Sequence, residues 1–364
     1  MNGNSVAVIG AGNGGYSMAG DLGSRGYSVN LYEHPNFADS FSEVLETKEV
    51  TINGALGSQK VKMHVATTDI EEAVSGVKIV NLVVPSTAQS LFFDELVNVL
   101  TEDQTLIVWA GRFGSLELVR KLKEKNIDQK FTIAEVDTLP YGARKSGPSS
   151  ANIYYTSRRL YVSSIPISKN EEICLTLNSM FSNIKPLKNV LAVAFSNPAL
   201  VVYGIGALLN AARIQHTNGK FYLFAEGITE SVADVMYQAY MEITAVAHAY
   251  GAFMPEYQRK EFDGPVSIEN VVFESPEGNE GFAKMDGPSN IRGRYMMENI
   301  GDAIAPIAEF GDIAGVETPL LDAITTLGSV ICGTDFRTEG RNLTRLGLSG
   351  LTMQQILNIV ENRN

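Results

Sequence analysis

The stretch Gly10-Ala11-Gly12-Asn13-Gly14-Gly15 decides the fold of the first half of the chain. It directly follows a hydrophobic strand predicted over Ser5–Ile9 and opens a Gly- and Ala-rich helix predicted from about Gly14 to Arg25. The first glycine allows a tight turn, the second lets the backbone approach a pyrophosphate, and the last lets the helix pack closely on the strand. The phosphates then lie at the positive end of the helix dipole. The pattern predicts a dinucleotide-binding turn made by all six residues.

An acidic residue follows the second predicted strand, Ser28–Tyr32, at the distance expected for a ligand of the ribose 2′-hydroxyl. This residue is Glu33. Its carboxylate repels a 2′-phosphate, and no Lys or Arg occurs in the next four residues, His34–Phe37. The sequence therefore predicts NAD(H) as the coenzyme in preference to NADP(H). The alternative is an ordinary strand–helix turn followed by a solvated strand-end glutamate.

Further apolar runs are typical of buried parallel strands joined by crossover helices. They are Lys78–Val84, Thr105–Trp109 and Thr132–Val136, and about Ala151 to Ser164 is expected to add strands that close the domain. Pro85, Ser86 and Gly111 follow strand ends, which in this fold line the crevice that holds the nicotinamide. We expect them to contact the coenzyme, although simple turns explain these residue types equally well.

The pattern changes near Lys185–Pro186, beyond which apolar residues recur at helical spacing. The helical windows are Ser231–Tyr250, Ile304–Ala314, Leu320–Ile331 and Thr352–Val360. The predicted architecture is an α/β Rossmann domain with a doubly wound parallel sheet over residues 1–187. An all-α domain over residues 188–364 is expected to hold the substrate and the dimer contacts.

Composition excludes several classes of function. The net charge is −12 and the chain has no basic block, so neither nucleic acid nor an anionic membrane is an expected partner. Ser196-Asn197-Pro198 interrupts the apolar stretch Val190–Ala212, which favours a buried core helix over a membrane span. The two distant cysteines predict no metal site and no disulfide, and with no basic leader before the first strand they indicate a cytoplasmic protein.

Longer strings in the second half carry a resemblance to a known family. They are Leu208-Leu209-Asn210-Ala211-Ala212-Arg213, Glu226-Gly227-Ile228-Thr229, Arg294-Tyr295, Thr318-Pro319-Leu320, Thr334-Asp335-Phe336-Arg337 through Glu339-Gly340-Arg341, and Leu346-Gly347-Leu348-Ser349-Gly350-Leu351-Thr352. Over nearly the whole chain the sequence resembles the octopine/opine dehydrogenase family, most nearly the bacterial N-(1-carboxyethyl)-norvaline dehydrogenase type.

The resemblance implies a Rossmann domain, a helical substrate domain and a homodimer. It also implies reduction, by NAD(P)H, of the imine formed between an α-keto acid and the amine of an amino acid. Family members use a His–Asp pair as proton donor and its orienter, and an Arg five residues before the Asp holds substrate. In this chain Tyr203 occupies the His position and Asn299 the Asp position, whereas Arg294 is retained.

The two replacements are chemically consistent with each other. A phenol is neutral at pH 7 because its reference pKa is about 10, so it donates a proton without a carboxylate partner. We therefore expect Tyr203 to be the proton donor and Asn299 its uncharged partner. Arg294, and in a second contact Arg144, are expected to bind a substrate carboxylate.

Each of these residues also has a plainer interpretation. Tyr203 is alternatively an aromatic packing residue at the domain junction, and Asn299 a polar helix residue. Arg294 is alternatively part of an interdomain ion pair, and Arg144 part of a structural salt bridge. Asp302 or Glu298 could supply the missing carboxylate, and His216 is a substitute acid if its loop reaches the cleft.

Three functions follow from the sequence. The first is an NADH-dependent oxidoreductase that reduces a C=N (imine) or C=O bond of a carboxylate-bearing small molecule, with Tyr203 as proton donor. The alternative is a conventional opine dehydrogenase that condenses an α-keto acid with an amino acid. The third is a catalytically silent NAD-binding protein with a regulatory role.

Overall fold

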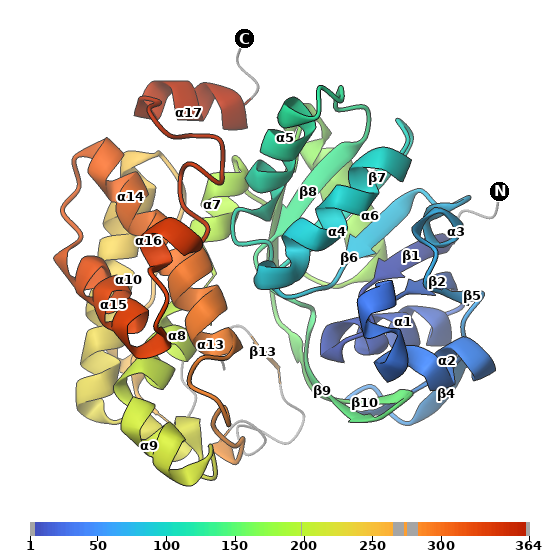
Figure 1. The fold of residues 1–364 in the computed structure, drawn as a ribbon, viewed down its shortest axis with the longest axis horizontal. Helices are drawn as coiled ribbons and strands as arrows, with labels where there is room; N and C mark the ends of the chain where they lie inside the picture. The colour runs from blue at the N-terminus through green and yellow to red at the C-terminus, as the bar shows by residue number, and fades with distance from the viewer. Residues whose placement is uncertain (1–3, 198, 265–272, 275–282, 362–364) are drawn as a thin grey trace. The chain divides into compact units, whose positions relative to one another are not determined.

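The computed structural model describes residues 4–197, 199–264, 273–274 and 283–361. The chain divides into two compact units (Figure 1). The first runs to Pro186 and takes in the short strand β13 (Phe273–Glu274), and the second begins at Leu187. The return of a later segment to the first unit has no counterpart in the sequence prediction.

The first unit is built on an eight-stranded sheet with the order β12-β11-β8-β7-β6-β1-β2-β5. Its strands are β1 (Ser5–Ile9), β2 (Ser28–Tyr32), β5 (Val65–Thr67), β6 (Ile79–Leu82), β7 (Thr105–Trp109), β8 (Thr132–Val136), β11 (Leu160–Ile165) and β12 (Ile184–Pro186). Strand β1 pairs in parallel with β2 on one side and with β6 on the other, and β11 runs antiparallel to β8. The strand order therefore reverses between β1 and β6, where α/β sheets bind ligands at their carboxyl ends.

Helices cover both faces of this sheet, as the doubly wound prediction requires (Figure 1). Val6 and Val8 of β1 pack with helices α1 (Asn13–Ser24) and α6 (Asn170–Met180). Ala7 and Ile9 face the opposite way, toward α3 (Ile70–Val74), α4 (Ser86–Val99) and α5 (Gly114–Glu124). Because both faces are buried, the strands are continuous apolar runs instead of alternating ones. The predicted fold class is confirmed.

A second sheet was not predicted. It consists of β3 (Glu49–Gly54), β4 (Gln59–Lys62), β9 (Tyr141–Gly147), β10 (Ser150–Ser157) and β13, and it follows η1 (Pro35–Phe41) and α2 (Ser42–Thr47) in the chain. The expectation that about Ala151–Ser164 adds further strands to this domain is confirmed by β10 and β11, but only β11 joins the main sheet. Strand β10 instead pairs with β3 and β9 of the second sheet.

Helix α1 lies between the two sheets, and this position explains its small residues. A Cβ on Gly20 would approach Ile52 of β3 to 2.3 Å, and a Cβ on Gly23 would approach Val61 of β4 to 2.5 Å. An ordinary surface helix has a polar face, but residues 14–22 of α1 are buried throughout. The glycines let a second sheet pack onto the side of α1 that faces away from β1.

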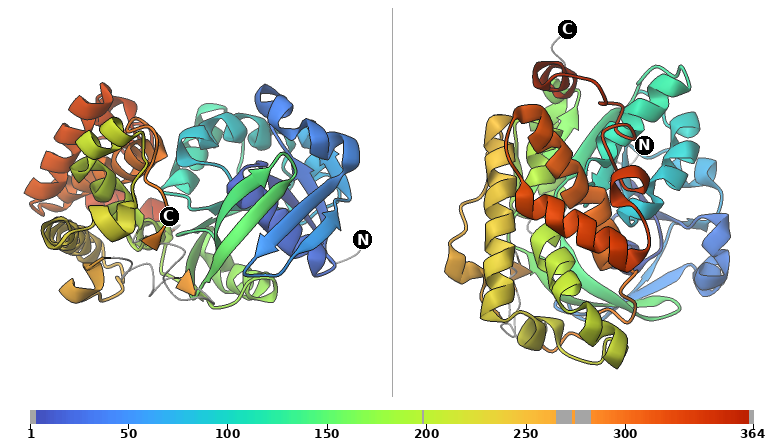
Figure 2. Two further views of the ribbon diagram at one scale, coloured as in Figure 1. Left: turned by 90° about the horizontal axis from the view of Figure 1, so that it is seen from below. Right: turned by 60° about the vertical axis from the view of Figure 1, so that its left-hand side comes forward.

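The described part of the second unit consists of helices joined by loops (Figure 2). They are α7 (Val190–Phe195), α8 (Ala199–Leu209), α9 (Ala211–Thr217), η3 (Leu223–Gly227), α10 (Glu230–Ala249), η4 (Arg259–Phe262), α13 (Arg294–Met296), η5 (Met297–Ile304), α14 (Ala305–Ala314), α15 (Pro319–Cys332), α16 (Phe336–Glu339) and α17 (Met353–Val360). Helix α8 is central and contacts α10, α13, α15 and η5.

One stretch of the described chain is long and apolar enough to cross a membrane. It is Val190–Leu209, with a mean hydropathy of 1.7, and 94% of its most apolar window is buried. Helices α7 and α8 form this stretch and lie in the core of the helical unit. Such burial is what the core helix of a globular domain shows, in agreement with the sequence interpretation.

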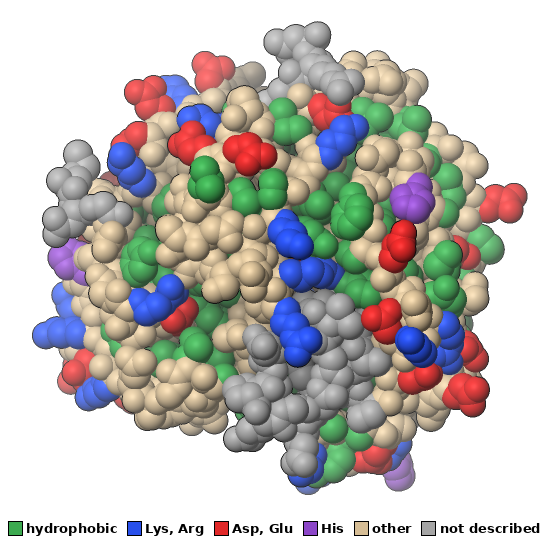
Figure 3. Space-filling view, turned by 180° about the vertical axis from the view of Figure 1, so that it is seen from behind, with side chains coloured by type: hydrophobic (Ala, Val, Ile, Leu, Met, Phe, Trp, Pro, Cys, Tyr) green, Lys and Arg blue, Asp and Glu red, His purple; other side chains and the backbone are tan. Residues whose placement is uncertain are grey.

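Many surface cations are paired with acidic side chains. Lys60 contacts Glu49 at 2.6 Å, and Lys121 contacts Asp94 at 2.7 Å. Acidic and basic side chains both occur on the face shown in Figure 3. Pairing of this kind lowers the local positive potential that a phosphate backbone requires.

Candidate coenzyme and active sites

The glycine-rich turn between β1 and α1 has a geometry that suits a pyrophosphate. Gly10 has a φ of +101°, and its N–H donates to Tyr32 O at 2.9 Å, which joins the start of the turn to the end of β2. A Cβ on Gly15 would lie 1.7 Å from Gly10 O, so only glycine lets the helix start this close to the strand. By contrast, a Cβ on Gly12 would meet no described atom within 4 Å. The turn therefore leaves open space at the N-terminus of α1, which fits a nicotinamide dinucleotide.

Asn13 and Gly14 have structural roles in the same turn. The side-chain oxygen Asn13 Oδ1 accepts a hydrogen bond from the backbone N–H of Lys145 on β9 at 2.8 Å. A Cβ on Gly14 would approach Val83 and Leu139 to 2.8 and 2.9 Å. Both residues therefore fix the turn against neighbouring segments. We still predict that their backbone atoms contact the coenzyme.

Glu33 follows β2 and its carboxylate is bound on both oxygens. Oε2 accepts the N–H of Ala11 and Oε1 accepts the N–H of His34, each at 2.9 Å. Burial raises the pKa of the Glu33 carboxyl above its ordinary value, while these N–H groups and the charge of Lys145 act in the opposite direction. A carboxylate has about four acceptor positions, so Glu33 retains capacity for a ribose hydroxyl.

Pro85, Ser86 and Gly111 lie at the carboxyl edge of the main sheet, the first two after β6, which neighbours β1, and Gly111 after β7, one strand further away. Pro85 precedes α4, and Ser86 is its first residue and fully buried. A Cβ on Gly111 would approach Glu135 to 2.3 Å, so close packing already explains this glycine. Their predicted coenzyme contacts remain predictions.

The loop after β7 has a strained backbone, which sequence reasoning missed. Ala110, Arg112 and Phe113 have φ values of +49°, +49° and +68°, a region that side chains other than glycine rarely adopt. The buried carboxylate of Glu135 holds this loop, because it accepts the N–H of Phe113 at 2.8 Å and the N–H of Ser115 at 3.0 Å. Strain of this kind gathers at functional sites. No sequence motif marks the loop, since the strain comes from packing against Glu135.

A buried carboxyl also follows β8 at the same edge. Asp137 Oδ1 accepts the N–H groups of Tyr161 and Thr138, at 2.9 and 3.0 Å. Arg159 Nη1 lies 3.8 Å from Asp137 Oδ2. Burial raises the pKa of Asp137 to about 6, although Arg159 and the N–H donors lower it. The carboxyl therefore changes charge within a physiologically relevant pH range.

We expect Asp137 to make the first unit less stable as the pH rises. Its pKa rises from 3.8 unfolded to about 6 folded, so the stabilisation is complete below pH 4 and is lost as the pH passes 6. The shift corresponds to about 3 kcal/mol of unfolding free energy. Urea unfolding at several pH values, followed by fluorescence of the single tryptophan, Trp109, measures it. The Asp137→Asn variant should lose this dependence, and parallel pH curves for the two proteins would contradict the assignment.

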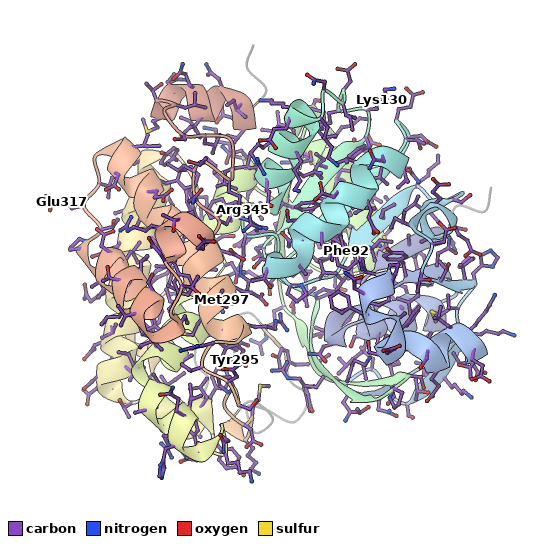
Figure 4. All side chains as sticks on the ribbon, in the orientation of Figure 1. Phe92, Lys130, Tyr295, Met297, Glu317 and Arg345 are labelled. Atoms are coloured by element: carbon purple, nitrogen blue, oxygen red, sulfur yellow. The ribbon has the colours of Figure 1, made fainter. Side chains whose placement is uncertain are left out.

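In the helical unit Tyr203 belongs to an aromatic cluster. Its half-buried ring lies 4.9 Å, between centroids, from Tyr295 of α13 and 5.6 Å from Phe224 of η3. Figure 4 labels Tyr295 in the side-chain view. The structure thus brings the predicted proton donor together with the helix that carries Arg294. Sequence reasoning missed Tyr295 and Phe224, because aromatic residues at helical spacing usually indicate a core.

Arg294 is paired with an acidic residue of its own helix. Its Nε donates to Glu298 Oε1, and the Glu298 carboxylate raises the pKa of Arg294. The side chain of Glu298 is 2% exposed, whereas that of Arg294 is 56% exposed. The buried carboxylate of Glu298 therefore fixes the orientation of the Arg294 guanidinium, and the side of the guanidinium away from Glu298 faces solvent. The alternative interpretation, an interdomain ion pair of Arg294, is not the pair that the structure shows, because Glu298 lies four residues further along the same continuous α13–η5 segment.

Asn299 lies at the contact between η5 and α8. Its side chain is 3% exposed, and Nδ2 donates to Tyr295 O at 3.0 Å. A Cβ on Gly204 would approach Asn299 Cβ to 3.1 Å, so Asn299 packs beside the residue that follows Tyr203. This placement suits a residue that positions the Tyr203 helix better than one that touches substrate.

Of the two elements whose rings contact Tyr203, η3 has π-helical winding, and α13 is an α-helical turn that continues into the π-helical segment η5. Segment η3 carries Phe224, and η5, which continues α13, carries Asn299. π-Helical turns are rare and occur frequently at functional sites, because their wider winding moves a side chain out of the α-helical register. Two such segments around one phenol support a functional role for this cluster.

The other candidates lie elsewhere. Arg144 is exposed on β9 of the first unit, where its Nη1 donates to Ala143 O. His216 is exposed in the last turn of α9, and Asp302 is buried within η5. A shared site for Arg144 and Arg294 stays a prediction, and the described residues hold no cluster of metal-ligating groups.

Two family models match the chain, one for each half. Residues 186–332 match the α-helical domain of NAD/NADP octopine/nopaline dehydrogenase. Residues 5–139 match the N-terminus of NAD-dependent glycerol-3-phosphate dehydrogenase. The chain is also 28% identical to an opine dehydrogenase of Arthrobacter sp. (strain 1C), over 98% of this chain and 99% of the relative. The helical half therefore matches the octopine/nopaline dehydrogenase family model, and the chain as a whole is similar to opine dehydrogenases.

Further relatives agree with this assignment. The protein Ocs of Agrobacterium tumefaciens (strain Ach5) is 23% identical over 97% of this chain and 98% of its own. A structure of octopine dehydrogenase with NADH and pyruvate superposes with a TM-score of 0.70 at 20% identity, covering 99% of this chain and 98% of the other. The chain is therefore a nicotinamide-dependent oxidoreductase that acts on CH–NH groups, with the Rossmann and helical domains expected from the sequence.

Proposed function

We propose that this opine dehydrogenase-like protein uses NADH to reduce a C=N bond, or a C=O bond, of a small carboxylate-bearing molecule. Tyr203 is its proton donor. The observation that carries the proposal is the cluster in which Tyr203 lies against Tyr295, next to the Arg294–Glu298 pair. Structures of octopine dehydrogenase with pyruvate and with L-arginine support an α-keto acid and an amino acid as the substrate class.

Each residue of the cluster has a distinct task in the proposed mechanism. The solvent-facing side of the Arg294 guanidinium binds the carboxylate, while Glu298 fixes its orientation from behind. The bound coenzyme supplies the hydride to carbon. Tyr203 Oη gives its proton to the nitrogen of the C=N bond, which becomes an N–H, and the phenolate regains a proton from water. Asn299 positions Tyr203 through the close contact between η5 and α8.

The nature of the product separates the two bond types. With an α-keto acid and an amino acid present, reduction of the imine yields a secondary amine, whereas reduction of the ketone yields a hydroxy acid. Mass spectrometry of the products distinguishes them directly. A secondary amine supports conventional opine synthesis with Tyr203 in place of histidine, and a hydroxy acid alone would exclude it.

A preference for NADH over NADPH belongs to the same proposal. The buried carboxylate of Glu33 supports it, because a carboxylate accepts a ribose hydroxyl and repels a phosphate. A structure of yersinopine dehydrogenase with NADP⁺, at a TM-score of 0.69 and 13% identity over 98% of this chain, shows the same fold. The fold alone therefore does not determine which coenzyme binds. The proposed preference for NADH rests on the acidic residue Glu33.

We expect Glu33→Gln to shift the preference toward NADPH. The change removes one charge and keeps the side-chain shape. The dissociation constant of NADPH divided by that of NADH should therefore fall at least ~10-fold, or about 1.4 kcal/mol. Calorimetry with both coenzymes measures the ratio, and Glu71→Gln, an exposed change on α3, is the matched control. Equal affinity of the unmodified protein for NADH and NADPH would contradict the preference.

Two further expectations belong to the proposal, and one alternative to it remains. A homodimer is expected, and the mass of the protein in solution tests it. A cytoplasmic location is expected, and cell fractionation tests it. A catalytically silent NAD-binding protein is the remaining alternative, and it predicts NADH binding without turnover.

A further inference from the structure

Lys145 lies on β9 and is fixed against the first turns of α1. Its backbone N–H donates to Asn13 Oδ1 at 2.8 Å, within the glycine-rich turn. Its ammonium Nζ lies 4.2 Å from the ring centroid of Tyr16 on α1 and donates to Ser40 O at 3.3 Å. The half-buried ammonium is therefore held over an aromatic face by contacts on two sides.

Glu33 contacts the same turn of the chain. Its Oε2 accepts the N–H of Ala11, two residues before Asn13. The carboxylate of Glu33 and the ammonium of Lys145 thus flank the segment from Ala11 to Tyr16, where the coenzyme phosphates and the adenosine ribose are expected.

The two charges influence each other without forming an ion pair among the described residues. Burial lowers the pKa of Lys145, and the negative charge of Glu33 acts to raise it. In the other direction, the positive charge of Lys145 lowers the pKa of Glu33. The site therefore presents one negative and one positive group that are near each other but not in contact.

We propose that Lys145 is a coenzyme-specificity residue whose ammonium binds the adenosine 2′-phosphate of NADP(H), so that the site accepts NADPH as its second coenzyme. A site with Glu33 alone would place a carboxylate against the phosphate, and the repulsion between the two negative charges would weaken NADPH binding. An ammonium beside it offsets this repulsion and contributes little to a neutral ribose hydroxyl. The inference rests on the proposed function, in which Glu33 binds the ribose and NADH is preferred.

Sequence analysis did not identify a basic residue for the 2′-phosphate, because Lys145 is far from Glu33 along the chain. The usual position for a basic residue is just after the acidic one, and His34–Phe37 contains none. Strand β9 comes much later in the chain and belongs to the second sheet. The second sheet packs on α1, and this packing brings Lys145 to the coenzyme turn.

The test measures the dissociation constants of NADH and NADPH for the unmodified protein, Lys145→Met and Lys145→Arg. We expect Lys145→Met to weaken NADPH binding at least ~10-fold and NADH binding less than ~3-fold, the difference expected for one lost charge–phosphate contact. Lys145→Arg should keep the NADPH affinity within ~3-fold, because it keeps the charge. Lys62→Met, an exposed change on β4 of the same sheet, is the matched control for net charge.

The outcomes separate this inference from the proposed function. Equal losses for both coenzymes would place the ammonium at the pyrophosphate and overturn the inference, and so would an unchanged NADPH affinity. Failure of the unmodified protein to bind NADH would instead contradict the proposed function. Lys145→Arg reports on the charge even if the methionine variant unfolds. In a double-mutant cycle, Glu33→Gln should raise NADPH affinity less when Lys145 is present than when it is methionine, because the ammonium already offsets the repulsion.

Discussion

The Tyr203→Phe variant is expected to lose at least ~10²-fold in turnover, the usual scale for a missing general acid. The substitution removes one oxygen and keeps the ring, so the packing against Tyr295 and Phe224 is preserved. NADH affinity should not change, because the glycine-rich turn belongs to the other unit. Steady-state kinetics and NADH titration measure the two quantities separately.

A matched control for this change is Tyr237→Phe. Tyr237 lies on α10 of the same unit, where its ring contacts Phe262 at 5.5 Å between centroids. It loses the same hydroxyl at a site that the proposed chemistry does not use, so turnover should stay within ~2-fold, the range of an uninvolved surface or packing site. Full activity of Tyr203→Phe would make the phenol a packing residue and would direct attention to Asp302 or a water molecule.

The second large effect is expected from substitutions of two glycines in the turn. Gly15→Ala should lower stability, whereas Gly12→Ala should lower coenzyme affinity. In Gly15→Ala the new methyl group would lie 1.7 Å from Gly10 O, against backbone that cannot move away. The strain should destabilise the first unit by about 3 kcal/mol, the upper end of the usual range for overpacked sites, because the clash is with backbone. Thermal unfolding followed by Trp109 fluorescence should show a clearly lower Tm.

Gly12→Ala should leave the fold intact and remove the coenzyme. Its methyl group would meet no described atom within 4 Å, so the Tm should stay within a few degrees of the unmodified protein. The same methyl group would occupy the space predicted for the pyrophosphate, and NADH affinity should fall at least ~10-fold. A Gly12→Ala variant with unchanged NADH affinity would mean that the dinucleotide does not approach this turn.

The sequence was sufficient for the main sheet, because each strand there is marked by its own residues. Ser5–Ile9, Ser28–Tyr32, Thr105–Trp109 and Thr132–Val136 were predicted with the bounds that the structure has. They are apolar on both faces, and turn residues or helices of clear pattern separate them. The long helices α10, α14, α15 and α17 were predicted within a residue or two for the same reason: their apolar positions repeat at helical spacing.

The second sheet was missed because its strands carry a weak local signal. Strand β4, Gln59–Lys62, is mostly exposed and polar, and β9, Tyr141–Gly147, alternates small and charged residues. These strands are stabilised by packing on α1. The sequence feature that reflects this packing is the pair of glycines in α1. Gly20 and Gly23 lie where an ordinary helix would have larger side chains, and they are explained only once β3 and β4 are in place.

The candidate active site shows a similar division. The positions of Tyr203, Arg294 and Asn299 followed from the family resemblance, and the structure brings all three to one region of the helical unit. The pairing of Arg294 with Glu298 and the π-helical winding of η5 did not follow. The ion pair is local, and the four-residue spacing of Arg294 and Glu298 on a helix was the signal that could have predicted it. The π-helical winding has no comparable signal in one sequence.

The most direct test of the central claim is the rate of NADH oxidation with an α-keto acid, with an amino acid, and with the two together. Pyruvate and L-arginine are the first pair to try, because octopine dehydrogenase has been solved with each of them. The account predicts NADH oxidation that depends on the carboxylate-bearing substrate and that falls at least ~10²-fold in Tyr203→Phe. Tight NADH binding without oxidation, across a panel of keto acids with and without amino acids, would contradict it and leave a coenzyme-binding protein without this catalysis.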